Sequence, residues 1–111
     1  MTPTTKTRRE SLEGFVKASP NDAFARYGLA LECAKLGDDA AAQEHFKQLI
    51  AANPSYVAGY FHYGALLARL GNNLEARQIL TTGVAVAEQS GDTHARDEMQ
   101  AALAALPLFR V

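Results

Sequence analysis

The apolar residues of this chain recur three and four positions apart, in segments that end near glycine or proline. This spacing predicts α-helices, because a half-buried β-strand would alternate apolar and polar residues instead. Residues 22–35 carry apolar side chains on two faces, so this helix is expected to lie between neighbours. The segments over residues 8–18, 22–35, 38–52, 55–69, 72–89 and 92–106 therefore predict six helices and almost no strand.

Residues suited to helix caps stand at the expected starts and ends. Gly37 and Gly71 follow periodic segments where a left-handed C-cap residue is favoured. Asp22 can cap the helix that follows it. Asn72 lies three residues before Glu75, a spacing that predicts a variant of the capping box.

The helical pattern repeats along the chain. Leu36-Gly37 occurs again as Leu70-Gly71, and subtracting 37 from 71 gives a period of 34 residues. A helix-turn-helix repeat has this length, and a match of many pairs in one register is far more specific than one shared dipeptide. The same offset relates Pro20 to Pro54, Leu29 to Tyr63, Ala30 to Gly64, Lys35 to Arg69, Ala42 to Ala76, Phe46 to Leu80 and Ile50 to Val84.

In this register the chain resembles the tetratricopeptide repeat family, whose helix pairs carry small and apolar residues at fixed places. The resemblance implies an all-α fold, a right-handed superhelical stack of antiparallel helix pairs with about six helices. Close crossings are expected at Ala30 with Ala42 and at Gly64 with Ala76. The match lies in Leu29, Ala30, Ala42, Phe46 and Pro54 of the first unit and in Tyr60, Tyr63, Gly64, Ala76, Leu80 and Gly83 of the second.

The repeat register also predicts how the chain is organised. We expect a disordered tail over residues 1–7, a single repeat domain over residues 8–106, and a C-terminal tail over residues 107–111. In that tail Leu108, Phe109 and Val111 are expected either to dock on a protein surface or to fray. Within the domain the parts are a half-repeat helix (8–19), a first repeat (22–56), a second repeat (57–90) and a capping helix (92–106).

Composition narrows the class of protein. The 111 residues are 48% hydrophobic and 21% charged, which is typical of a folded, soluble helical domain. Eleven basic and twelve acidic residues give a net charge of -1, which argues against binding nucleic acid or an anionic membrane. The single cysteine and the lack of a long apolar run favour a cytoplasmic protein.

Residues with reactive side chains have simpler structural explanations. Cys33 is expected to be a buried small hydrophobe, and His45 and His62 stand apart from any catalytic partner in sequence. His94 and Glu98 share a helix face with Asp97 and could hold a metal only weakly. We therefore expect no catalytic residue, no cofactor and no metal. Gly28, Gly59 and Gly83 lie inside helices and predict close packing, of a neighbouring helix in preference to a bound chain.

The resemblance implies a function as well as a fold. Family members bind peptides or helices of partner proteins in a concave groove lined by the first helix of each unit. We expect a non-enzymatic interaction module for an apolar partner segment with one or two acidic residues; the alternatives are a weak homodimer formed through the repeat ends and, less favoured, an enzyme. The groove places fall on Phe24, Tyr27, Leu31, Lys35, Phe61, His62, Ala65 and Arg69.

Overall fold

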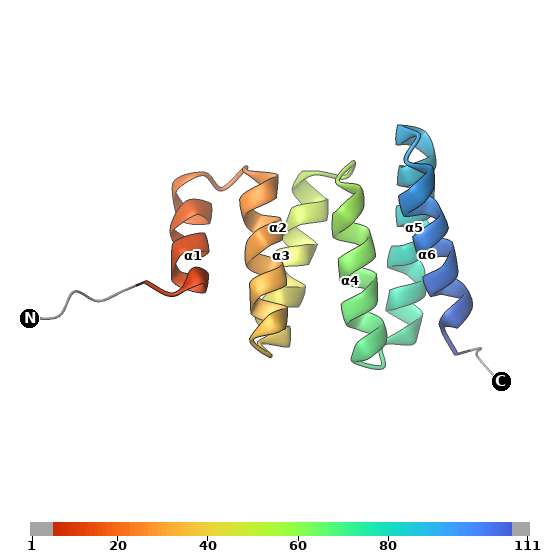
Figure 1. Ribbon diagram of the computed structural model, residues 1–111, viewed down its shortest axis with the longest axis horizontal. Coiled ribbons are helices and arrows are strands. Elements are labelled where there is room, and N and C mark those ends of the chain that lie inside the picture. The colour runs from red at the N-terminus through yellow and green to blue at the C-terminus, as the bar shows by residue number, and fades with distance from the viewer. Residues whose placement is uncertain (1–5, 108–111) are drawn as a thin grey trace, which may run out of the picture. The chain divides into compact units, whose positions relative to one another are not determined.

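The computed structural model describes residues 6–107, which form six α-helices and no strand. The predicted all-α class and the six-helix count are confirmed (Figure 1). The expectations for residues 1–5 and for Leu108, Phe109 and Val111 lie outside the described residues. The helices are α1 (Arg8–Ala18), α2 (Ala23–Lys35), α3 (Asp39–Ala52), α4 (Val57–Arg69), α5 (Asn73–Ser90) and α6 (Thr93–Ala105).

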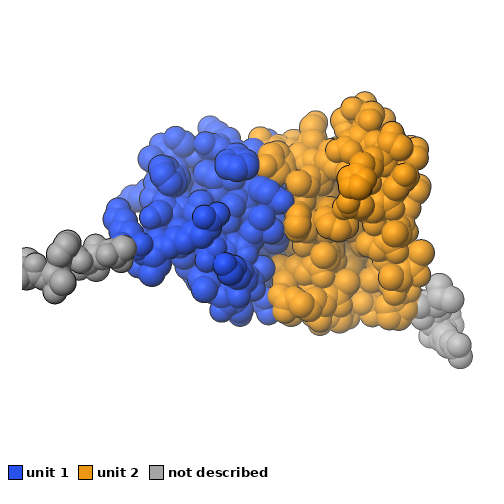
Figure 2. Space-filling view, in the orientation of Figure 1, with its two compact units in different colours: residues 1–52 blue, residues 53–111 orange. Residues whose placement is uncertain are grey.

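The helices belong to two compact units, residues 1–52 and residues 53–111 (Figure 2). In the first unit α2 packs against both α1 and α3. In the second unit α5 packs against both α4 and α6, and α4 also touches α6. The second helix of each unit thus has neighbours on two sides, and a helix with apolar residues on two faces can bury both of them in this position. The predicted single domain stays a prediction.

Small and large residues alternate in the core of the first unit. Ala30 on α2 and Ala42 on α3 are both fully buried, so short side chains lie where these helices pack together. Leu29 and Phe46 fill the space beside them at 1% exposure each. Cys33 is fully buried in the same core, as predicted.

The second unit brings α4 very close to α5. A Cβ built on Gly64 would lie 2.5 Å from both Cγ and Cδ2 of Leu80. The sequence predicted that Gly64 faces Ala76, which is also fully buried, but the nearest side chain is Leu80, one helical turn further along α5. Gly83 is close to its neighbours too, since a Cβ there would lie 2.6 Å from Cβ of Tyr60. The neighbouring helix is therefore what packs on Gly83.

Most of the predicted caps form. The carboxylate of Asp22 accepts a hydrogen bond from the backbone N–H of Ala25 at 3.1 Å. Gly37 and Gly71 have φ angles of 83° and 81°, the left-handed conformation that glycine adopts without strain. Asp92 caps α6 by the same kind of bond as Asp22.

Two predictions about caps are wrong. Asn72 makes no side-chain cap bond, and the carboxylate of Glu75, the other half of the predicted capping box, instead accepts a hydrogen bond from the Tyr63 hydroxyl at 3.0 Å. Thr7 was assigned to the tail, but its hydroxyl accepts a bond from the backbone N–H of Glu10 at 3.1 Å, and the two residues form a capping box at the start of α1. The ordered part of the chain therefore begins before Arg8.

Candidate functional site

An apolar hollow of about 390 Å³ lies between α1 and α2 in the first unit. We call it the α1–α2 hollow. The two helices are joined by a short turn, so one end of the hollow is at this turn and the other is at the start of α1. Arg8, Leu12, Phe15, Ala18, Ser19, Asp22, Phe24, Ala25, Tyr27, Gly28 and Leu31 line it.

Large apolar side chains at this hollow are open to solvent. Phe15 is 63% exposed and Phe24 is 76% exposed, whereas Tyr27 and Leu31 beside them are half-buried. Exposed aromatic side chains gathered around a concave surface are typical of an interaction site. Helical spacing puts Phe15 on the same face of α1 as Leu12, but its side chain stays exposed, since among the described helices α1 packs only against α2.

The floor of the hollow is formed where α1 crosses α2. A Cβ built on Gly28 would lie 3.3 Å from Cδ2 of Leu12, so the glycine lets α1 approach α2 closely. This contact confirms that a neighbouring helix accounts for Gly28. A larger residue at this position would push Leu12 outward and fill the hollow.

Two charged residues line the hollow, one at each end. Arg8 lies at the start of α1, where its side chain is 71% exposed and its Nε is 3.2 Å from Oε2 of Glu32. Asp22 lies at the turn and caps α2. An apolar surface therefore runs from a basic side chain to an acidic one.

In the second unit Phe61 and His62 line a different hollow, of about 380 Å³, between α4 and α6. The two rings meet edge to face with centroids 5.2 Å apart. Burial lowers the pKa of His62, and the nearby carboxylate of Glu98 opposes that shift. Asp92 and Glu98 contribute acidic groups to the lining of this hollow.

The structure groups some of the predicted groove residues and leaves others apart. Phe24, Tyr27 and Leu31 line the α1–α2 hollow together, and Phe61 and His62 line the α4–α6 hollow together. The other three predicted residues are exposed and line neither hollow: Lys35 ends α2, Arg69 ends α4 and Ala65 lies within α4.

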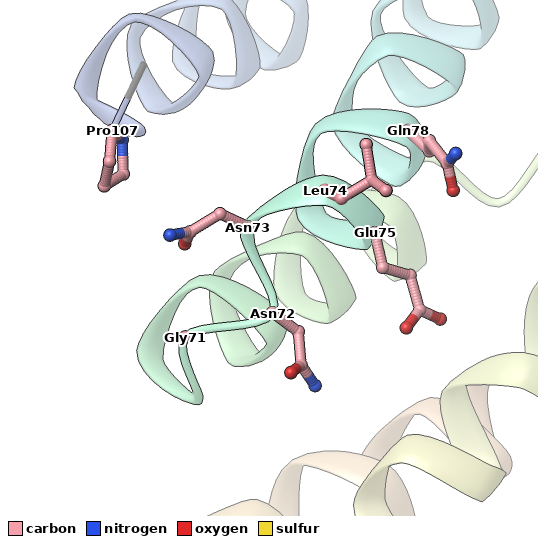
Figure 3. Close-up of a pocket in the computed structure, with 7 residues that line it drawn as sticks. All are labelled: Gly71, Asn72, Asn73, Leu74, Glu75, Gln78 and Pro107. Carbon is pink, nitrogen blue, oxygen red and sulfur yellow. The ribbon is translucent and has the colours of Figure 1, made fainter. Parts of the chain in front are cut away.

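A hollow of about 660 Å³ beside the first turn of α5 contains none of the predicted residues. Figure 3 shows the side chain of Asn73 on the side of α5 where Pro107 lies, with Leu74 and Gln78 along the same stretch of helix. Four of its seven lining residues have polar side chains, and Leu74 at its edge is 58% exposed. A wide and open depression encloses little of a bound side chain.

The reactive side chains are held in structural contacts. Cys33 is buried, and that burial raises the pKa of its thiol. His94 pairs with Glu98, and Asp97 accepts hydrogen bonds from Arg96. Over residues 6–107 no three His, Cys, Asp or Glu side chains come together in a way that could hold a metal ion. Nor does this stretch contain a helix that is long and apolar enough to span a membrane.

Sequence reasoning missed the contribution of α1 to the hollow. The predicted groove contains no residue of α1, although Leu12 and Phe15 supply one wall of the hollow. The available signal was the helical half-repeat itself: α1 stands where the second helix of a preceding pair would stand, and the first helix of that pair is not in residues 6–107.

Comparisons with known proteins agree with this architecture. A TPR repeat-containing protein of Pseudomonas aeruginosa is 32% identical over 90 residues, which cover 81% of this chain and 86% of that protein. The crystal structure of a tetratricopeptide repeat domain protein from Salinibacter ruber is 34% identical with a TM-score of 0.71, and the match covers 75% of this chain and 92% of that one.

A protein from Bordetella parapertussis extends the structural likeness over more of the chain. Its solution structure is 25% identical with a TM-score of 0.77, over 90% of this chain and 87% of that one. No protein-family model matches this sequence. The 34-residue period, the helix pairs and the relative from Pseudomonas aeruginosa together show that this chain belongs to the tetratricopeptide repeat family.

Proposed function

We propose that this protein holds an apolar segment of another protein in the α1–α2 hollow. Proteins of the tetratricopeptide repeat family are in general interaction modules and generally non-enzymatic. The observation that carries the proposal is the exposure of Phe24 and Phe15 beside a concave apolar surface. Tyr27 and Leu31 supply the floor on which an inserted side chain would lose its contact with water.

Aromatic side chains with few rotatable bonds suit a binding hot spot, because little conformational entropy is lost when they are covered. The hollow is small, about 390 Å³, so the affinity should be modest. Arg8 at one end favours an acidic residue in the bound segment, because its exposed guanidinium has further N–H groups beside the Nε that contacts Glu32. The ligand class is therefore an apolar protein segment with an acidic residue near one end.

The α4–α6 hollow in the second unit is a weaker candidate. Phe61 and His62 are both half-buried there, and Asp92 and Glu98 place carboxylates at the rim. The first unit leaves its aromatic residue Phe24 open instead. We therefore assign the main contact with the partner to Phe24, Tyr27 and Leu31.

Site-directed photo-cross-linking tests the proposal. A photoreactive phenylalanine is placed at position 24, and a matched one at position 74, where Leu74 is also exposed. A partner that is cross-linked from position 24 alone is then purified and its affinity measured. The Phe24→Ala and Tyr27→Ala pair should weaken binding by about tenfold or more, whereas Leu74→Ala should not change it.

Two results would reject this assignment. One is a partner that is captured equally from positions 24 and 74. The other is a purified partner whose affinity survives the Phe24→Ala and Tyr27→Ala pair. Sedimentation of the isolated protein over a range of concentrations addresses self-association, because a homodimer that buries Phe24 would compete with any partner at this hollow.

A further inference from the structure

We propose that the α1–α2 hollow is the seat of an α-helix, supplied by the partner protein, which completes the repeat to which α1 belongs. This inference rests on the proposed function and specifies the shape and chemistry of the bound segment. It follows from comparing the two units, because the second unit contains a helix in the place that is open in the first.

The second unit shows how a complete repeat is built. Its α4 pairs with α5 and also touches α6 (Figure 1). Two periods of 34 residues, or 68 residues, relate α1 to α5, and α6 follows α5 as α2 follows α1. The same offset of 68 relates Leu12 to Leu80 and Phe15 to Gly83.

Equivalent residues differ in burial between the two units. Leu80 is 1% exposed because it packs against Gly64 of α4. The equivalent Leu12 is only half-buried. In the described part of the first unit no helix stands where α4 stands in the second, which explains why Leu12 remains partly open to solvent.

The second unit, taken as the template, also determines the direction of the bound helix. Short loops join α4 to α5 and α5 to α6, so α4 runs antiparallel to α5 and parallel to α6 (Figure 1). A helix in the equivalent seat would run antiparallel to α1 and parallel to α2. Its length should be close to the 13 residues of α4, because the walls of the seat have nearly the same length.

One difference between the two units determines which residue the bound helix needs at its centre. Phe15 stands where the second unit has Gly83, and Tyr60 of α4 packs directly on that glycine. Phe15 and a tyrosine at the place of Tyr60 would occupy the same space, so the two cannot be present together. The partner therefore needs a small residue where α4 has Tyr60, and another small residue opposite Leu12, as Gly64 is opposite Leu80.

The charges at the two ends of the hollow agree with this direction. The C-terminus of the bound helix would lie beside Arg8, and its N-terminus would lie beside Asp22. A helix carries partial negative charge at its C-terminus and partial positive charge at its N-terminus, so both contacts are favourable. A helix in the opposite direction would meet like charge at each end.

A synthetic helix derived from α4 provides the probe. The peptide spans residues 55–72 with Tyr60→Ala, to leave room for Phe15, and Arg69→Glu, to place an acid beside Arg8; a polar tag keeps it soluble. The matched control peptide also carries Gly64→Arg, which removes the close approach to Leu12. Each labelled peptide is titrated with the full-length protein by fluorescence anisotropy and by circular dichroism.

We expect saturable binding of the probe, a gain in helix content on binding and no saturable binding of the control peptide. Phe15→Arg in the protein should weaken binding of the probe by about tenfold or more, while Leu74→Arg should leave it unchanged. Both substituted residues are exposed, so neither change should unfold the protein.

Three results would overturn the inference: no saturable binding of the probe, binding without a gain in helix content, or equal binding of the control peptide. A homodimer that Phe15→Arg dissociates would also overturn it, since a second copy would then fill the seat. None of these results affects the cross-linking test at position 24. A partner that depends on Phe24 but binds as an extended segment would leave the proposed function standing.

Discussion

Gly64 of α4 lies directly against Leu80 of α5: a Cβ on Gly64 would lie 2.5 Å from two atoms of the leucine side chain. The two helices therefore meet at this point with no side chain of α4 between them. This contact buries Leu80 almost completely, and Ala76, one turn earlier on α5, is also buried. The close pairing of α4 with α5 depends on the absence of a side chain at position 64.

Enlarging that glycine should weaken the second unit. We expect Gly64→Leu to lower the free energy of unfolding by about 1 to 3 kcal/mol, because the new side chain overlaps Leu80. Gly14→Ala is the matched control, since Gly14 lies in α1 with no atom near its missing Cβ, and it should raise stability by about 0.5 to 1 kcal/mol. Urea denaturation measures both, and equal stability of Gly64→Leu and the parent would show that the contact is not close.

The capping box at the start of α1 gives a second stability prediction. Thr7→Ala removes the hydroxyl that accepts the N–H of Glu10, and should cost about 0.5 to 2 kcal/mol. Thr81→Ala, at an exposed position inside α5, is the control and should change stability little. Melting curves of the two variants, followed by circular dichroism and compared with that of the parent, test this. If the Thr7 variant melted with the parent, the cap would contribute nothing to folding.

Cys33 should be unreactive in the folded protein. Its side chain is fully buried and that burial raises the pKa of the thiol, so little thiolate reaches solvent. A thiol reagent should label the native protein slowly and the urea-unfolded protein at once. Rapid labelling of the native protein would mean that the core between α2 and α3 opens readily.

Acid should destabilise the second unit through His62. Burial lowers the pKa of His62 in the folded state, so the unfolded chain, with a value of about 6.5, takes up the proton more readily. The stabilising contribution of neutral His62 is complete above that pH and is lost as the pH falls toward the folded-state pKa. The slope of stability against pH between about 7 and 5 should decrease in His62→Gln.

His45 in the first unit is the internal comparison for this measurement. Burial and the nearby Arg26 also lower the pKa of His45, so part of the pH dependence should remain in His62→Gln. His45→Gln combined with His62→Gln should reduce it further. An unchanged slope in the double variant would assign the acid sensitivity to other groups.

Much of the fold could be predicted from the sequence because helix signals are local. The glycines at 37 and 71 and the cap at Asp22 stand at the predicted ends of helices, and the 34-residue period predicted the family. The capping box predicted from the spacing of Asn72 and Glu75 does not form: Asn72 makes no side-chain cap bond, and the Glu75 carboxylate bonds to Tyr63 across the helix pair. The contact between Glu75 and Tyr63 is tertiary, and a local pattern does not contain it.

The candidate site was predicted less completely. Phe24, Tyr27 and Leu31 were found from the repeat register, and the structure places them in one hollow. The exposure of Phe15 was missed, because helical periodicity shows which residues share a face but not whether another helix covers that face. In the described part of the first unit no helix precedes α1, and this leaves that face of α1 uncovered.

NMR titration with the cross-linked segment of the purified partner tests most directly whether a partner segment lies in the α1–α2 hollow. Backbone amides of α1 and of Tyr27 and Leu31 should shift strongly, and Phe24→Ala should suppress those shifts. Shifts confined to α3 and α5, with the signals of Tyr27 and Leu31 unchanged, would contradict the assignment of the site.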